Sequence, residues 1–340
     1  MKKQLILNSS GKVVTLGAED NRRALRLEKM IKNDLGYNIP ITTLTQVLAK
    51  VSEQKFFEVA VADYIPVKVG DGAWADRILQ FRSQGVADDF STGIINTSVS
   101  NGRLASADAG IEAVSNPIYN WAKEIGWTLF DLRLAARSGN WDIVEAKEKA
   151  RKKNWDLGIQ SVGFLGLAGD TNKIPGLLNQ SGVTNNTTLI TEPLSGMTAA
   201  ELTTFLAGVL NAYRVNNNRT AWPDRFVIPE SDYLGLAVPS SSDFPIKSKL
   251  EILETTFKVL TKNPNFKILP LAYADNAYGG LGQRYALYNS SEDSIYMNIP
   301  VDYTSTAQST FNNFHFQNVA YGQFGGVFAN RPQELLYFTY

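Results

Sequence analysis

The clearest helical pattern in the chain begins at Thr198. Thr198-Ala-Ala-Glu201 is a capping box, in which the threonine hydroxyl accepts from a backbone amide and the glutamate reaches back to the cap. Apolar residues then recur at the spacing of one helix face, at Leu202, Phe205, Leu206, Val209, Leu210 and Tyr213. The pattern predicts an amphipathic helix that buries one side.

Strand and helix patterns alternate after this helix. Residues 225–229 and 266–270 read as strands, and residues 231–236 and 248–260 read as helices. Alternation of this kind predicts a compact α/β lobe over residues 185–275.

A charged helix is predicted over WDIVEAKEKARKKNWDLGIQ, residues 141–160. Two glutamate–lysine pairs stand four residues apart in the favourable order, Glu145–Lys149 and Glu148–Lys152. The helix runs into GFLGLAGDTNKIPGLLNQ, residues 163–180, which is apolar and punctuated by glycine. Glycine at a helix end favours a cap, so we interpret this segment as a turn and an apolar plug between two lobes.

The N-terminal third carries two different patterns. Residues 20–60 show helical spacing broken near Pro40, ending in a short strand-like run at residues 56–61. From residue 64 to about residue 116, short alternating pieces are separated by glycine, and small polar residues dominate. Such a segment makes little core, so it predicts a long polar β-hairpin that extends from the body.

The rest of the chain is strand-rich. Residues 118–128 resume a strand pattern before the charged helix. Further strands are predicted near the C-terminus, at residues 284–288, 294–299, 311–316, 325–328 and within the aromatic closing run 331–340.

The amino-acid composition excludes several kinds of functional site. The 340 residues suggest about two folding lobes. Cysteine is absent and His315 is the single histidine, which excludes disulfides, thiolate metal sites and multi-histidine metal sites. Lys+Arg and Asp+Glu are equal at 33 each, so no global field attracts nucleic acid, a membrane or an acidic substrate. The five basic residues from Lys147 to Lys153 indicate a solvated helix face, although a surface facing nucleic acid would share this composition.

No targeting segment is apparent. The apolar run in MKKQLILNSSGK is three residues long, against roughly 7–15 in an export signal. No stretch reaches the roughly 18–20 apolar residues of a membrane span. We therefore expect a protein made and kept in a cytoplasm.

Three candidate kinds of site each have a simpler structural explanation. The glycines of residues 163–180 lack the Gly-Lys-Ser/Thr of a phosphate loop, since Lys173 is followed by Ile-Pro. His315 lies between two phenylalanines, without a nucleophile elbow. Carboxylate pairs suit a glycosidase or a lectin with aromatic sugar contacts, but they fall where acids are common for capping and solubility: Asp88-Asp89, Glu292-Asp293 and Glu230/Asp232. The sequence predicts no catalytic residue, no cofactor and no metal.

Three stretches give the chain a resemblance to a known family. They are the charged helix with GFLGLAGDTNKIPGLLNQSGV, the pair TAAELTTFLAGVLNAYR and WPDRFVIPESDYLGL, and the closing GGVFANRPQELLYFTY. In this order they resemble the spine helix, the axial lobe and the last strands of a tailed-bacteriophage major capsid protein, whose Hong Kong phage-type fold is shared with encapsulins. The resemblance covers roughly residues 60–340.

The resemblance implies an α+β fold with five parts. These are an N-terminal arm (1–62), an extended β-hairpin loop (63–116), a peripheral lobe with a long spine helix and a sheet (117–184), an α/β axial lobe (185–275) and a return to the peripheral lobe (276–340).

It also implies a function. The chain would assemble with itself through hexamers and pentamers into an icosahedral shell in a bacterial cytoplasm, enclose double-stranded DNA by non-specific contact, and meet portal, scaffold or decoration proteins. An encapsulin-like shell with protein cargo is the alternative of the same fold. Five charged residues are the candidate contacts between subunits because they fall in the loop region: Lys68, Arg77, Arg82, Asp88 and Asp89.

Overall fold

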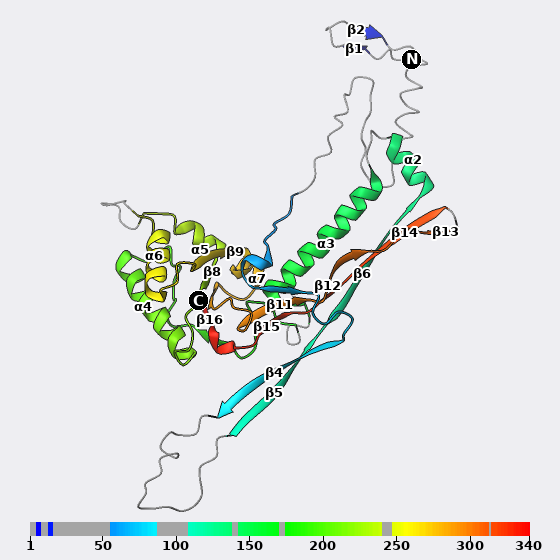
Figure 1. Ribbon diagram of the computed structural model, residues 1–340. Coiled ribbons are helices and arrows are strands. Elements are labelled where there is room, and N and C mark those ends of the chain that lie inside the picture. The colour runs from blue at the N-terminus through cyan, green and yellow to red at the C-terminus, as the bar shows by residue number, and fades with distance from the viewer. Residues whose placement is uncertain are drawn as a thin grey trace, which may run out of the picture. The chain divides into compact units, whose positions relative to one another are not determined.

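The computed structural model describes residues 5–7, 13–15, 55–86, 108–137, 142–169, 174–239, 247–312 and 314–340. They fall into two compact units: Met1–Phe56 with Trp127–Ala146, and Phe57–Gly126 with Lys147–Tyr340. Figure 1 labels their elements. The predicted helical patterns within residues 20–54 lie outside the described residues.

The first unit contains a small hairpin and a short helix. β1 (Leu5–Leu7) and β2 (Val13–Thr15) pair antiparallel. α2 (Leu129–Arg137) begins with a reciprocal cap, because the Thr128 amide donates to the Asp131 carboxylate (2.9 Å) and the Asp131 amide donates to the Thr128 hydroxyl (3.2 Å). These are the two bonds of a capping box, made with aspartate in place of glutamate.

The predicted charged helix is confirmed as α3 (Ile143–Leu165). Asp142 caps it, since its carboxylate accepts from the amides of Val144 (2.8 Å) and Glu145 (3.2 Å). The helix buries Trp155 and its last turn, including Phe164, in the core of the second unit.

The second unit is built on a five-stranded sheet. Its strands run in the order β7 (Thr184–Asn186), β16 (Leu335–Thr339), β10 (Arg284–Tyr288), β8 (Arg225–Pro229) and β9 (Lys267–Leu271). β10 is antiparallel to β16 and β8, whereas β7 and β9 are parallel to their neighbours. Strands and helices alternate here as predicted, and the helices are α4 (Ala199–Asn216), α5 (Glu230–Gly235), α6 (Lys249–Thr261) and the short α7 (Asn276–Gly279).

Each face of this sheet carries its own core. Along β10, Tyr285 and Leu287 pack with α4 and α6, while Ala286 and Tyr288 pack with the end of α3. β16 alternates in the same way, and all five of its residues are buried. Because successive side chains of a strand point to opposite faces, a strand covered on both faces is apolar throughout. In Figure 1 the helices α4 and α6 lie beside the sheet.

The closing strand lies in the same sheet as strands from residues 185–275. Residues 276–340 were expected to return to a peripheral lobe, and of them β10 and β16 lie in the interior of the sheet that also holds β8 and β9. The continuous run Leu335–Thr339 explains this position, because a strand buried on both faces needs apolar residues at every position.

Two smaller sheets complete the second unit. One has the order β15 (Val327–Ala329), β11 (Ile295–Ile299) and β3 (Val67–Val69), with β3 parallel to β11. The other joins β12 (Val301–Ser305), β14 (His315–Phe324) and β13 (Ser309–Phe311), and β6 (Tyr119–Thr128) also pairs with β14. The predicted strand over residues 311–316 is therefore two strands, which a turn separates at the left-handed Asn312 (φ 59°).

The predicted strand at residues 56–61 is wrong. Residues 55–60 form no regular element, and η1 (Val61–Asp63) is a single 3-10 turn. The side chain of Gln160 on α3 takes the place of a neighbouring strand: its oxygen accepts from the Val59 amide (2.9 Å) and its nitrogen donates to the Phe57 carbonyl (3.3 Å). The segment is thus held by one amide side chain rather than by a ladder.

The segment after α3 folds back onto the end of the helix. The amides of Leu177 and Leu178 donate to the carbonyls of Gly163 (2.8 Å) and Phe164 (3.0 Å), and both leucines are fully buried. A Cβ on Gly176 would lie closer than 3.0 Å to the backbone of Gly166 and Phe164. The glycine-punctuated motif is therefore a tight joint, as interpreted from the sequence, and not a phosphate loop.

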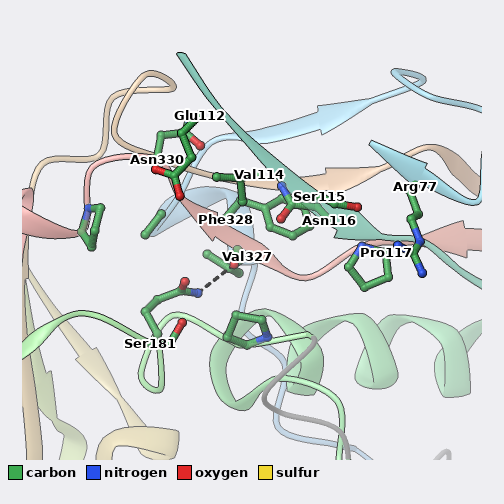
Figure 2. Close-up of a pocket in the computed structure, with 14 residues that line it drawn as sticks. Arg77, Glu112, Val114, Ser115, Asn116, Pro117, Ser181, Val327, Phe328 and Asn330 are labelled. Atoms are coloured by element: carbon green, nitrogen blue, oxygen red, sulfur yellow. Dashed lines mark hydrogen bonds between the residues drawn. The ribbon is translucent and has the colours of Figure 1, made fainter. Parts of the chain in front are cut away.

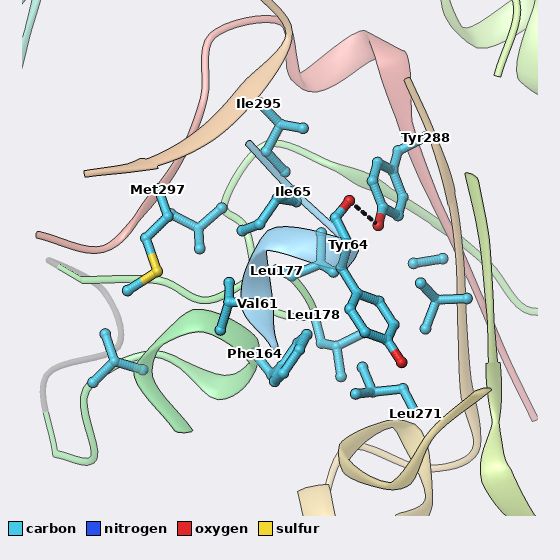
Figure 3. Close-up of a cluster of buried hydrophobic side chains, with 14 of the residues drawn as sticks. Val61, Tyr64, Ile65, Phe164, Leu177, Leu178, Leu271, Tyr288, Ile295 and Met297 are labelled. Carbon is cyan, nitrogen blue, oxygen red and sulfur yellow. Dashed lines mark hydrogen bonds between the residues drawn. The ribbon is translucent and has the colours of Figure 1, made fainter. Parts of the chain in front are cut away.

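Tyr64 lies in the same core, among the side chains shown in Figure 3. Its hydroxyl donates to the carbonyl of Pro270, and the Tyr288 hydroxyl donates to the Tyr64 carbonyl (2.8 Å). Burial, with the nearby charges of Asp63 and Glu230, raises the pKa of Tyr64 to about 12.

The joint predicts opposite effects for two glycine substitutions. Gly176→Ala should lower the free energy of unfolding by roughly 1–3 kcal/mol or more, because backbone must move to admit the methyl group. Gly158→Ala, inside α3 where a Cβ meets nothing within 4 Å, should raise it by roughly 0.5–1 kcal/mol. Urea denaturation of both variants measures the difference; equal effects would contradict the tight joint.

The raised pKa of Tyr64 predicts a loss of stability in alkali. A pKa that is higher in the folded state contributes stability below the ordinary value of 10.0, and this is lost as the pH rises to about 12. The loss is about 3 kcal/mol for Tyr64 alone. The free energy of unfolding of Tyr64→Phe should therefore fall less steeply above pH 10 than that of the wild type. Parallel declines would show that Tyr64 does not titrate as described.

Candidate interaction surface

A long two-stranded hairpin begins at residue 77 of the second unit. β4 (Arg77–Val86) pairs antiparallel with β5 (Asp108–Pro117) over ten consecutive residue pairs. The prediction of a hairpin is confirmed for these strands, but its start is later than residue 63, because β3 belongs to the sheet of β11 and β15. A two-stranded sheet is marginal by itself and gains stability from what covers its faces.

The outer face of the hairpin is apolar and uncovered. Leu79 lies opposite Ser115, Phe81 opposite Ala113, and Ile111 opposite Ser83. Residues opposite one another, and every second residue along a strand, share a face, so the three apolar side chains lie on one side. They are 60%, 69% and 73% exposed respectively. We call Leu79, Phe81 and Ile111 the outer patch.

The inner face of the hairpin, opposite the outer patch, contacts the rest of the second unit but leaves a hollow beside it. Gln80 accepts a hydrogen bond from the hydroxyl of Tyr296 (3.3 Å), and Asn116 is buried. A hollow of about 550 Å³ remains between β5, β15 and the segment around Gln180. Figure 2 shows Arg77 and Pro117 at one side of it. Two of the residues that line it are joined by a hydrogen bond, from the Gln180 side chain to the Val327 carbonyl (2.8 Å).

Of the five charged candidates, Lys68 lies outside the hairpin, whereas Arg77 and Arg82 lie on it as expected. Lys68 lies on β3, not on the hairpin, where its ammonium pairs with Glu292 (3.5 Å) and lies over the Tyr296 ring (4.6 Å). Arg77 begins β4 and lines the hollow. Arg82 lies opposite Glu112 in the register. Asp88 and Asp89 lie outside the described residues. The role of all five between subunits stays a prediction.

The predicted contacts are all charged residues and do not include the outer patch. The signal was present in RILQF, residues 77–81, where Leu79 and Phe81 alternate with Gln80. Alternation predicts a strand with one apolar face, and in a hairpin without a core that face has to meet something else.

The basic run on α3 corrects the prediction of a solvated face. The side chain of Arg151 is 1% exposed. Its guanidinium donates to the carbonyls of Lys123 (3.2 Å) and Asn318 (2.8 Å), to the Asn318 side chain (2.6 Å) and to the Tyr303 hydroxyl (2.9 Å), and it pairs with Glu148. Arg151 thus fastens α3 to strands β6, β12 and β14.

Two lysines of the same run also have partners within the protein. The ammonium of Lys147 donates to the carbonyl of Gly126 (2.7 Å), and Lys153 pairs with Glu58. A continuous basic surface for nucleic acid is therefore not what this run provides.

The acids of the candidate carboxylate pairs lie in different surroundings where the chain is described. Asp232, on α5, is buried and accepts three hydrogen bonds, from the Leu194 amide (2.9 Å), the Ser195 amide (2.8 Å) and the Tyr285 hydroxyl (2.8 Å). Glu292 and Asp293 are exposed in the turn before β11, and His315 is exposed at the start of β14. Among the described residues, no three histidines or acids cluster as metal ligands would.

Comparison with known proteins identifies the family. A model of the family described as Major capsid protein matches residues 96–340. The chain belongs to the major capsid protein family. Members of this family are structural proteins and not enzymes, and this chain is accordingly a capsid protein. No curated protein matches it.

Solved structures agree with the tailed-phage capsid fold. The capsid of Myoviridae phage XM1 is similar with a TM-score of 0.70 at 19% identity, over 89% of this chain and 99% of that chain. Mycobacterium phage Bobi gives 0.56 at 11% identity (88% and 97%), and the capsid of an empty GTA particle gives 0.54 at 11% (87% and 94%). The expected α+β capsid fold is confirmed. In the described part of this capsid protein, no helix is long and apolar enough to cross a membrane.

The burial of Arg151 predicts that alanine substitutions at two neighbouring residues of α3 have unequal effects on the free energy of unfolding. Arg151→Ala should lower the free energy of unfolding by roughly 3–5 kcal/mol, because Glu148, Tyr303 and two carbonyls lose a buried donor. Lys152→Ala, the exposed neighbour, should change it by less than about 0.5 kcal/mol. Chemical denaturation distinguishes the two, and similar small effects would contradict a fastening role for Arg151.

Proposed function

We propose that this capsid protein is the shell subunit of a tailed bacteriophage, assembling through hexamers and pentamers into an icosahedral shell that encloses double-stranded DNA. The observation that carries the proposal is the outer patch: ten residue pairs of hairpin present Leu79, Phe81 and Ile111 to solvent on one face. A partner that covers this face removes its apolar surface from water, and this burial stabilises the contact.

The occupant of the outer patch is a second copy of the chain. Capsid structures of the same fold support assembly of copies into a shell. Full burial of a large apolar side chain contributes roughly 1.5–3 kcal/mol, so three such side chains give a contact of moderate strength once association costs are subtracted. Moderate contacts suit a shell, because each subunit makes several of them at once.

The parts of the chain take the roles expected of the fold. The five-stranded lobe would lie at the capsomer centre, α3 with the smaller sheets would form the peripheral lobe, the hairpin would be the extended loop, and residues 1–62 would be the arm. Arg77 and Arg82 lie on the hairpin and are candidates for contacts beside the outer patch.

Contact with the enclosed DNA would be non-specific and weak. The formal net charge is zero, and the basic run of α3 is largely engaged within the subunit. A strong electrostatic contact needs several free cations facing the phosphates. Assembly in a bacterial cytoplasm and contacts with portal, scaffold or decoration proteins belong to the same proposal and follow from the family.

Removing the outer patch should separate folding from assembly. The double variant Leu79→Ser/Phe81→Ser should unfold within about 0.5 kcal/mol of the wild type, since both side chains are exposed in the subunit. It should form no closed shells. Sedimentation velocity with negative-stain electron microscopy measures this, on protein expressed alone and together with the other head proteins of its phage.

The conservative variants Leu79→Met and Phe81→Tyr are the matched control, because they keep the apolar area and should assemble. Normal shells from the serine variant would contradict the role of the patch. Wild-type particles that hold protein cargo and no nucleic acid would favour the encapsulin-like alternative over a DNA-enclosing capsid.

A further inference from the structure

A short loop between β3 and β4 presents a tryptophan in an unusual way. The backbone of Trp74 is left-handed, with φ 65°, and its side chain is 70% exposed. Bulky residues rarely adopt this conformation, because the Cβ crowds the backbone. In the described part of the chain the ring contact of the indole is with Tyr321, tilted by 43° with centroids 5.8 Å apart. The subunit thus gains little from the side chain that strains its backbone.

Buried polar side chains hold this loop in place. The amide of Trp74 donates to the side-chain oxygen of Gln323 (2.7 Å), and the Gln323 nitrogen donates to Asn120 (2.6 Å). On the other side of the loop, the Asn298 side chain donates to the Asp71 carbonyl (3.2 Å). Gln323 and Asn298 are both buried. Two buried amides therefore fix the position of a loop whose most prominent side chain points into solvent.

The loop is continuous with the hairpin. β4 begins three residues after Trp74, and the amide of Ile118 donates to the carbonyl of Asp76 (3.0 Å), which closes the base of the hairpin. Val69, at the other end of the loop, is also exposed. Trp74 and the outer patch are thus presented by one stretch of chain that is anchored at its base.

We infer that Trp74 is a central contact residue between two copies of the capsid protein, held in its binding conformation before assembly. The inference rests on the proposed function and adds a residue to it. A rigid aromatic side chain that needs no ordering on binding is typical of the residues that dominate protein interfaces. Nucleic acid is a poor partner for this loop, because Asp71 and Asp76 lie on the same loop as Trp74 and their charges repel phosphates.

The test separates a contact role from a structural one. Asparagine tolerates the left-handed conformation, so Trp74→Asn should leave the melting temperature of the free subunit unchanged or slightly higher. The yield of shells should nevertheless fall by roughly tenfold or more. Trp74→Phe, which keeps an aromatic ring, should assemble at an intermediate yield, and Trp222→Phe serves as the control at another exposed tryptophan.

Fluorescence gives a second readout on shells that do form. The difference in acrylamide quenching between the wild type and Trp74→Phe reports the Trp74 indole, which should be accessible in free subunits and protected in shells. Normal shell yield from Trp74→Asn, a lower melting temperature of its subunit, or an indole equally accessible in shells and subunits would each overturn the inference. Failure of the wild type to form shells under any condition would instead overturn the proposed function.

Discussion

Burial of the strand Leu335–Thr339 on both of its faces organises the second unit of this capsid protein. Leu336 and Phe338 face the core under α4 and α6, and Leu335 and Tyr337 face the core under the end of α3. A strand in this position cannot be removed without opening two cores at once. It also joins segments that are far apart in the sequence, since β16 lies between β7 and β10 in the sheet. Local contacts alone therefore cannot complete this sheet.

Polar side chains fix the geometry around these cores. Arg151 ties α3 to three strands, Gln160 replaces a strand for residues 57–59, and Asp232 fixes the start of the α4–α5 region to β10. Each is buried and hydrogen-bonded, so each specifies one arrangement at the cost of desolvation. Such groups explain how a chain with a modest share of charge and no cysteine positions several small sheets.

The hairpin, in contrast, is little covered by the rest of the subunit. Its strands pair over ten residues, yet one face is uncovered and a hollow separates the other from β15. A shell subunit needs a rigid lobe to define angles and an incompletely covered element to join its neighbours. Under the proposed function, the exposed apolar residues of the hairpin and Trp74 contact a neighbouring subunit. Residues that are unfavourable in the isolated subunit, such as a strained or exposed apolar residue, are often found at functional sites.

The sequence alone determined the elements whose signals are local. The capping box at Thr198, the charged helix, the paired α/β segments and the glycine joint all follow from spacing and turn chemistry, which act within a few residues. The sequence alone also excluded cysteine-based chemistry and, through three motifs, showed the resemblance to a capsid family. The tertiary structure decided what depends on distant partners: that Arg151 is buried while its neighbour Lys152 is exposed, that β16 lies between β7 and β10, and that Lys68 belongs to a core sheet. Charge and periodicity are the same for a buried and an exposed arginine on a helix, and only the packing of strands from residues 119–128 and 301–324 against it distinguishes them.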